Sequence, residues 1–513
     1  MQSASTDTEL LARFDAEVLA RVPHVEGGRV VGGTPMVDVT ETLAECGKTE
    51  YGLNIQKGGV RVFAKFDSKI EGGSVKVRPA VAIIRDAIAS GRLGRGQTVF
   101  EATSGNFGLA LAGIGRLGIN VVALVSRKLQ PGVIDQLQRD GVKLVNLDID
   151  VCPAPGLKGD VDLLVAKSVA ASVRQQLGEM GLDAAIFDRV KEEAEGLLAR
   201  QDAIGLAKLL ARAYGGFCTE QYDNDRNVEV HRTVTGPEVE EQLRQAGSSF
   251  GETDFVCSFG TGGTALGVGG YISSKHDRKG VRVVFPLTGQ DVAGIRTKEK
   301  AIGLKFYEPG SYVGEHEVDF EEASKVFEFF NRKGYDVGES GALALYACME
   351  LVNYGAGKKF VVMVADGASK YTSEVKAVAR RGKRDQVRLE EAASSIEGYG
   401  SVMWAHNMFV PKAEGVRVIA SSLGCNEDAV RVADVRDVQA VLNGREPSEV
   451  FERLLPADDR PVLIVCMAGN TSLMLAKVLE RRGVAAESLV GGITGLPASK
   501  GRPAFDLVQM ARP

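Results

Sequence analysis

The fold is decided by the stretch Gly72-Gly73-Ser74-Val75-Lys76-Val77-Arg78-Pro79-Ala80, which sets a lysine among small residues just before a predicted helix. Two later segments complete a pattern with Lys76, namely Thr103-Ser104-Gly105-Asn106 and Gly260-Thr261-Gly262-Gly263-Thr264. A lysine amine can form an imine, a small polar loop can hold a carboxylate, and a glycine-rich loop can wrap a phosphate. Each segment is a weak signal alone, but the three in this order are a strong one.

Length and composition describe an ordinary globular protein. A chain of 513 residues is too long for one compact core and predicts two or three domains. The net charge of −5 gives no indication of nucleic acid or an anionic membrane as a partner. No apolar run approaches the roughly 20 residues of a membrane span, and the first residues lack the apolar core of a signal peptide. We therefore expect a cytoplasmic protein without a membrane partner.

Cysteine and histidine usage argues against metal and disulfide sites. The seven cysteines are scattered and contain no C-x-x-C pair, which favours a reducing compartment. His231 and His406 have no metal-ligand spacing around them, so we interpret both as structural and expect no metal.

Strand and helix signals alternate through most of the chain. Residues 120–125 and 359–365 are apolar runs of the buried parallel-strand type, and residues 78–90 have apolar side chains near helical spacing. Predicted strands at 98–102 and 255–259 lead directly into the polar loop and the glycine-rich loop. This alternation predicts an α/β fold with a parallel sheet and helices on both faces.

Two regions depart from that alternation. Residues 158–214 are charged and rich in helix signals, which predicts a helical insertion that lids the site, forms an oligomer interface, or merely decorates the surface. Charge concentrated near residues 380–388 predicts a linker. We therefore expect a domain over 1–390 and a second α/β unit over 400–513.

The glycine-rich loop is the candidate phosphate site. Glycines between a strand and a helix let backbone N–H groups converge on an anion, and Thr261 and Thr264 add hydroxyl donors. A simple βα turn is the alternative for this loop alone, and the spacing does not fit a dinucleotide fingerprint. With Lys76 as a buried nucleophile and Thr103–Asn106 at a helix start, the set predicts a pyridoxal phosphate site.

These segments resemble the fold-type II pyridoxal phosphate enzymes of the cysteine synthase and cystathionine β-synthase group. The resemblance covers about residues 30–371 and includes further segments: Gly33-Thr34-Pro35, Gln221-Tyr222-Asp223-Asn224 with His231, Thr235-Gly236-Pro237-Glu238, and Ser340-Gly341-Ala342. It implies a two-lobed parallel-sheet fold, pyridoxal 5′-phosphate as cofactor, an amino-acid substrate and a homodimer.

The resemblance also implies residue roles. Lys76 holds the cofactor and later moves the Cα proton, while Asn106 bonds the 3′-oxygen of the cofactor. The expected phosphate ligands are Gly260, Thr261, Gly262, Gly263 and Thr264, and the expected carboxylate ligands are Thr103, Ser104, Gly105 and Gln221. Where the family has a small hydroxyl residue near the ring nitrogen, this chain has Ala365-Asp366-Gly367. Either Asp366 faces that nitrogen or a water beside Gly367 does.

A second motif lies in the C-terminal unit. Cys466 follows a predicted strand at 461–465 and opens a helix at 473–482, a setting that favours a thiolate. Cys466-Met467-Ala468-Gly469-Asn470-Thr471-Ser472, with Val490 to Leu496 and Ala433-Asp434-Val435-Arg436, resembles a rhodanese domain. The resemblance implies a persulfide carried on Cys466, although Thr471 replaces an arginine common in sulfurtransferases. The alternative is a buried structural cysteine.

The implied reaction is β-elimination or β-replacement on a serine- or cysteine-type amino acid, through an aminoacrylate, with Cys466 as sulfur donor or acceptor. Two alternatives remain open. The chain either uses a non-sulfur nucleophile to give a diaminopropionate-like product, or it is a cysteine lyase. In both, the rhodanese-like unit is regulatory or a binding module.

Overall fold

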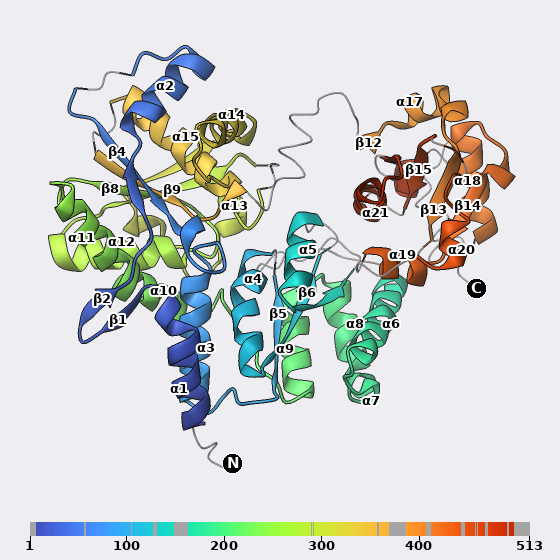
Figure 1. The fold of residues 1–513 in the computed structure, drawn as a ribbon, viewed down its shortest axis with the longest axis horizontal. Coiled ribbons are helices and arrows are strands. Elements are labelled where there is room, and N and C mark those ends of the chain that lie inside the picture. The colour runs from blue at the N-terminus through green and yellow to red at the C-terminus, as the bar shows by residue number, and fades with distance from the viewer. Residues whose placement is uncertain are drawn as a thin grey trace.

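The computed structural model has three bodies in a row, each built on its own sheet (Figure 1). It describes residues 7–55, 58–103, 105–126, 131–147, 163–288, 290, 292–355, 359–368, 386–406, 412–442, 447–456, 458, 460–466, 470–489 and 492–496. The first two bodies carry the Lys76 motif and its companions, and the third carries Cys466.

The first body is a six-stranded sheet in the order β10-β9-β8-β11-β4-β3, in which only β3 is antiparallel to its neighbour. Its strands are β3 (Met36–Asp38), β4 (Arg61–Phe66), β8 (Asp254–Ser258), β9 (Val281–Pro286), β10 (Gly314–Val318) and β11 (Lys359–Val364). Alternate residues of a strand enter opposite cores, since successive side chains point to opposite faces. Val62 packs with α2 (Thr40–Tyr51), α14 (Phe320–Arg332) and α15 (Glu339–Asn353). Phe63 packs with α11 (Gly236–Gln245) and α12 (Gly263–His276).

The second body is a parallel three-stranded sheet with helices on both faces. Its strands are β5 (Thr98–Ala102), β6 (Asn120–Val125) and β7 (Lys143–Asn146). One face carries α3 (Val77–Ala89), α4 (Asn106–Ala112) and α5 (Pro131–Arg139). The other carries α6 (Leu163–Glu179), α7 (Ala184–Asp188), α8 (Lys191–Ala199) and α9 (Ala203–Ala213).

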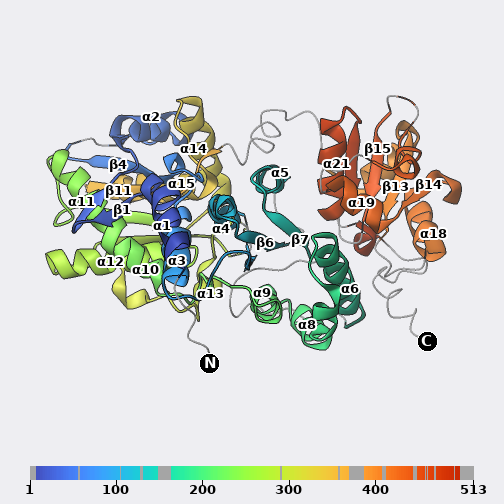
Figure 2. The same ribbon diagram turned by 60° about the horizontal axis from the view of Figure 1, so that its bottom comes forward.

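Helices α6 to α9 occupy the region where the sequence predicts a helical insertion. They bury Phe100 and Val122 of the sheet in a shared apolar core, and α9 packs along β5. In both ribbon views α6 and α8 lie on the side of this sheet away from the six-stranded sheet (Figures 1 and 2). The interpretation as mere surface decoration is therefore wrong, because these helices form the apolar core on one face of this sheet.

The third body is a parallel five-stranded sheet in the order β12-β16-β15-β13-β14. Its strands are β12 (Gln386–Val387), β13 (Ser401–Ala405), β14 (Val430–Ala433), β15 (Val462–Val465) and β16 (Ala486–Leu489). Trp404 packs under α18 (Lys412–Leu423), while Ile464 and Cys466 face α19 (Val435–Leu442) and α21 (Asn470–Arg481). Helix α21 also contacts α5 of the second body.

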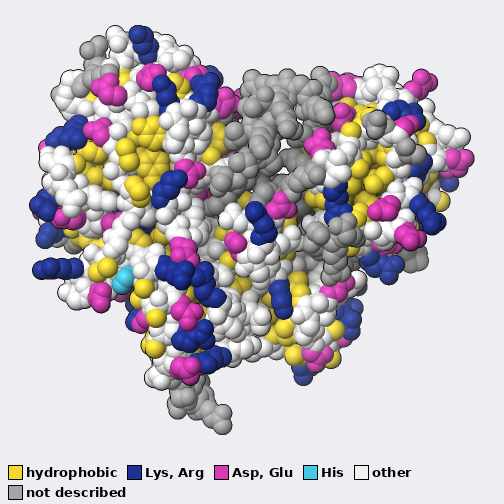
Figure 3. All heavy atoms as spheres, viewed as in Figure 1, with side chains coloured by type: hydrophobic (Ala, Val, Ile, Leu, Met, Phe, Trp, Pro, Cys, Tyr) yellow, Lys and Arg dark blue, Asp and Glu magenta, His cyan; other side chains and the backbone are white. Residues whose placement is uncertain are grey.

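The surface shows no field of a single charge sign on the face seen in Figure 3, where acidic and basic side chains are interspersed. No helix in the described ranges is long and apolar enough to cross a membrane. Within those same ranges, no group of three or more His, Cys, Asp or Glu side chains is arranged to hold a metal ion.

Candidate active site

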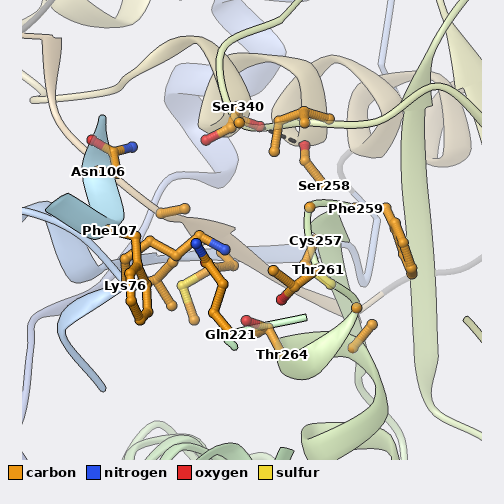
Figure 4. Close-up of a pocket in the computed structure, with 18 of the residues that line it drawn as sticks. Lys76, Asn106, Phe107, Gln221, Cys257, Ser258, Phe259, Thr261, Thr264 and Ser340 are labelled. Carbon is orange, nitrogen blue, oxygen red and sulfur yellow. Dashed lines mark hydrogen bonds between the residues drawn. The ribbon is translucent and has the colours of Figure 1, made fainter. Parts of the chain in front are cut away.

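Seven of the predicted site residues line one pocket between the first two bodies, where strands end and helices begin (Figure 4). Lys76 lies between two groups of polar side chains, with Asn106 and Ser340 on one side of the view and Gln221 and Thr264 on the other. The predicted residues that line this pocket are Lys76, Asn106, Gln221, Gly260, Thr261, Gly262 and Thr264.

Lys76 directly precedes α3, in a loop tied to the six-stranded sheet. The N–H of Val75 donates to the carbonyl of Ala365 at 2.7 Å, which fixes the loop against the end of β11. A Cβ built on Gly260 would lie 3.6 Å from Lys76 Nζ, so the amine faces the glycine-rich loop. Burial and the nearby charge of Arg296 lower the pKa of Lys76 to about 8. The amine is therefore a far better nucleophile and base at neutral pH than a surface lysine.

The glycine-rich loop has no room for larger side chains. Gly262 has φ +90°, and a Cβ there would lie 2.4 Å from the carbonyl oxygen of Phe306. A Cβ on Gly263 would lie 2.1 Å from Oδ1 of Asn227, whose amide in turn donates to Thr261 Oγ1 at 3.0 Å. The loop opens α12, a helix of 14 residues, so its dipole and free N–H groups favour a dianion at this end.

His231 supports the same loop. It begins a π-helical turn, His231–Thr235, and is buried with Nε2 3.2 Å from Thr264 Oγ1 and Nδ1 3.0 Å from Thr235 Oγ1. Burial, followed by the charge of Arg78, lowers the pKa of His231 to about 3, so the ring is neutral at physiological pH. The sequence analysis interpreted His231 as structural, and the structure shows that its ring contacts a hydroxyl of the glycine-rich loop.

Asp366 lies beside Asn106. Its Oδ2 accepts a hydrogen bond from Asn106 Nδ2 at 2.8 Å, and its Oδ1 accepts one from Ser340 Oγ at 3.4 Å. Ser340 lines the pocket, whereas Asp366 is not among the described lining residues. The role of Asp366 toward the ring nitrogen thus stays a prediction. Sequence reasoning missed Ser340 as a pocket hydroxyl, although the segment Ser340-Gly341-Ala342 pointed to a helix start there.

The predicted carboxylate loop is only partly described. Thr103 is buried, and its hydroxyl accepts hydrogen bonds from the N–H groups of Gly105 and Gly108 at 3.1 and 3.2 Å. Ser104 lies outside the described residues. Thr103, Gly105 and Gly263 are not among the described residues that line the pocket. Thr103 shapes the loop, and the carboxylate role of Thr103, Ser104 and Gly105 remains a prediction.

Two motif segments that lack a place in the pocket, those of Thr34 and Glu238, meet instead in a buried charge cluster beside the Lys76 motif. Arg78 Nε contacts Asp67 Oδ2 at 2.7 Å, and Arg78 Nη1 contacts Glu238 Oε2 at 2.8 Å. Lys65 pairs with Glu238, whose Oε1 also accepts from the N–H of Thr34 at 2.8 Å. We call Lys65, Asp67, Arg78 and Glu238 the charge quartet. It anchors the start of α3, and with it the lysine two residues before Arg78.

Cys466 follows β15 at its carboxyl end and is buried. Ser472 Oγ donates to Cys466 Sγ at 3.2 Å and lies 2.8 Å from Ser488 Oγ. The N–H of Ile493 donates to the carbonyl of Cys466 at 2.8 Å. Residues 467–469 of the predicted persulfide loop lie outside the described residues. The thiol thus has hydroxyl partners, and its reactivity stays a prediction.

Comparison with known proteins identifies the first two bodies. The family model described as "Pyridoxal-phosphate dependent enzyme" matches residues 30–367. A cysteine synthase from Aquifex aeolicus is 27% identical over 67% of this chain and 89% of its own length. Cysteine synthase B from Pseudomonas aeruginosa is 25% identical, over 67% and 94% of the two chains. The crystal structure of a hydrogen sulfide-producing enzyme shares the fold, with a TM-score of 0.50, 19% identity and coverage of 71% and 91%.

The chain belongs to the pyridoxal-phosphate dependent enzyme family. It is a cysteine synthase-like enzyme whose cofactor is pyridoxal 5′-phosphate. The pocket fits this cofactor, because the glycine-rich loop at the start of α12 suits a phosphate and faces the buried amine of Lys76.

Proposed function

We propose that this enzyme catalyses β-replacement or β-elimination on a serine- or cysteine-type amino acid. The observation that carries the proposal is the Lys76 amine, with a pKa lowered to about 8, in one pocket with the glycine-rich helix start and Gln221. The cysteine synthase relatives support the same reaction class.

Each side chain has a role that follows from its chemistry. Lys76 would carry the cofactor, and its neutral amine takes the proton from Cα of the substrate. Thr261, Thr264 and the loop N–H groups would hold the phosphate, and Asn106 the 3′-oxygen. The Gln221 amide receives the substrate carboxylate. Bound pyridoxal phosphate supplies an electron sink for the charge that develops at Cα.

A visible absorbance titration of the holoenzyme tests this reaction. Serine, O-acetylserine, O-phosphoserine and cysteine are added in turn, and the expected result is a new absorption band with one of them, accompanied by release of its leaving group. Lys76→Ala should abolish both. A purified protein that gains no chromophore after addition of pyridoxal phosphate would refute the proposal.

We also propose that the chain divides into a cofactor domain and a rhodanese-like sulfur carrier, predicted at 1–390 and 400–513. We assign β12 (Gln386–Val387) to the carrier, because this strand belongs to the sheet of that unit. The support is the position of Cys466 at the carboxyl end of a central parallel strand, with the strand order β12-β16-β15-β13-β14 around it. A terminal persulfide sulfur on Cys466 would add to the substrate β-carbon after the leaving group departs. A thiol reductant would then cleave the resulting mixed disulfide, which frees the thiol product and Cys466. Covalent linkage of the two units raises the local concentration of the carrier.

Cys466→Ser separates this role from its alternatives, with Cys425→Ser as the matched control in the same unit. Cys425 is half-buried and lies in neither motif. With a sulfane-sulfur donor and a thiol reductant, we expect Cys466→Ser to lose the thiol amino acid while leaving-group release continues. Unchanged product would favour a non-sulfur nucleophile, a lyase, or a regulatory C-terminal unit. The expected homodimer, proposed on the family resemblance, is tested by light scattering.

A further inference from the structure

The buried carboxyl group of Glu101 contacts Gln221, a residue that lines the pocket. Glu101, near the end of β5, is 3% exposed and accepts a hydrogen bond from Gln221 Nε2 at 3.2 Å on its Oε1. Its Oε2 accepts a second hydrogen bond from Thr219 Oγ1. Among the described residues no lysine, arginine or histidine forms an ion pair with Glu101. Gln221 itself is 5% exposed and lines the pocket, so its amide stands between this carboxyl group and the substrate.

The surroundings of Glu101 do not neutralise its charge. Burial raises the pKa of Glu101 to about 7, and the hydrogen bonds from Thr219 and Gln221 offset only part of that rise. Glu220 of the neighbouring segment raises the pKa of Glu101 further, and the charge of Glu101 in turn raises the pKa of the Cys218 thiol. Lys208 of α9 is 2.6 Å from Glu220 and pairs with that residue instead. Glu101 can therefore exchange a proton close to neutral pH.

We propose that Glu101 is a positioning residue that couples binding of the substrate carboxylate at Gln221 to the uptake of one proton. The inference rests on the proposed function, in which Gln221 receives that carboxylate. It follows from the chemistry of the Gln221 side-chain amide, whose NH2 group donates hydrogen bonds and whose oxygen accepts them. An ionised Glu101 can only accept, so it holds the NH2 group of Gln221. A protonated Glu101 can donate to the amide oxygen, which turns the NH2 group toward the substrate.

The charge of Glu101 also links protonation of this residue to binding of the substrate carboxylate. A negative Glu101 behind Gln221 repels the incoming carboxylate, and this repulsion is strong because the site is buried. Binding therefore favours the protonated form, and the proton comes from the solvent. The apparent affinity for amino acids should fall as pH rises through the range in which Glu101 ionises.

The test measures binding of L-alanine, which has no leaving group, to the holoenzyme between pH 6 and pH 8.5. The dissociation constant is read from the change in visible absorbance. Because ionisation of the alanine amine affects every variant alike, the informative quantity is the ratio of wild type to Glu101→Gln. We expect the wild-type constant to rise relative to that variant on the order of tenfold between pH 7 and pH 8.5. An unchanged ratio would overturn the proposal.

Further variants keep the test decisive if Glu101→Gln does not fold. Thr219→Val removes a donor that favours the ionised carboxyl, so the midpoint of the pH dependence should move upward, whereas Thr219→Ser should keep it. Glu350→Gln is the matched control, because Glu350 is a half-buried carboxyl of α15 whose pKa burial also raises. It should leave the wild-type profile intact. A midpoint that stays fixed in Thr219→Val would also overturn the coupling.

Failure of the proposed function and failure of the proton coupling give different results in this binding experiment. A holoenzyme whose absorbance does not respond to L-alanine at any pH would remove both the amino-acid site and the coupling. A normal response with a slope shared by wild type and Glu101→Gln would remove the coupling alone.

Discussion

The Asn106 side-chain amide donates a hydrogen bond to the Asp366 carboxylate at 2.8 Å. Asn106 begins α4 beside the three-stranded sheet, whereas Asp366 follows β11 of the six-stranded sheet. The bond therefore joins the two bodies that form the pocket, through a residue expected to bind the cofactor. Residues 260 positions apart in the chain meet there.

Removing this bond should loosen the contact between the two bodies. Asp366→Ala leaves the half-buried amide of Asn106 without that acceptor, which costs about 0.5–1.5 kcal/mol of unfolding free energy. Asp366→Asn keeps an acceptor oxygen and should lose less. Urea unfolding of the cofactor-free protein measures both, and equal losses in the two variants would contradict the prediction.

The lowered pKa of Lys76 predicts how the cofactor-free protein takes up pyridoxal phosphate. At pH 7 about a tenth of an amine with a pKa of 8 is neutral, against about 0.04% for an ordinary lysine. The loading rate should rise with pH and level off above about pH 8. Stopped-flow absorbance measures this rate, with Lys76→Arg as the unreactive control. A rate that keeps climbing to pH 10 would rule out the lowered pKa.

Gly262→Ala should damage the glycine-rich loop that we propose holds the phosphate. The added methyl group would lie 2.4 Å from Phe306 O and 2.8 Å from Phe259 Cζ, at a positive φ that alanine rarely adopts. About 2 kcal/mol of strain corresponds to cofactor binding weakened on the order of 30-fold. Gly269→Ala in the same helix meets only Val281 at 3.4 Å and serves as the control. Equilibrium dialysis of pyridoxal phosphate compares the two.

Neutral His231 makes the fold sensitive to acid. Its pKa is about 3 in the folded chain and near 6.5 in the unfolded chain, so between these values the unfolded chain binds more protons. The free energy of unfolding therefore falls as pH drops from 6.5 toward 3. His231→Gln escapes this loss, so the stability of wild type relative to the variant should decrease by about 2 kcal/mol between pH 7 and pH 5. Urea titrations at the two pH values measure the difference, and a constant difference would contradict the assignment.

The regular elements were largely predictable from local patterns. The strands predicted at 98–102 and 120–125 coincide with β5 and β6, since both segments are rich in residues that favour strands. After the predicted helix start at Thr103–Asn106, α4 ends at Ala112 and a 3-10 segment, Gly113–Leu117, follows. Gly113 and Gly115 explain this early end, because glycine weakens an α-helix.

The contacts behind the pocket were not predictable. Nothing near Glu101 in the sequence indicates that it holds Gln221, which lies 120 positions further on. Likewise Ser340 reaches the pocket only because α15 starts beside the end of β11. Local patterns predict which segments are strands and loops, whereas side-chain partners across two bodies depend on how those bodies pack.

The charge quartet also constrains how this chain can change over generations. Loss of one member leaves its partner as an unpaired charge inside the core. This lowers the free energy of unfolding by about 3–5 kcal/mol, a large part of the stability of a typical domain. Single substitutions at Lys65, Asp67, Arg78 or Glu238 should therefore be purged, while a joint exchange of both partners can survive. The segment that carries Lys76 is thus held by positions that must mutate together. Substitutions within the charge quartet should therefore occur in pairs and not one at a time.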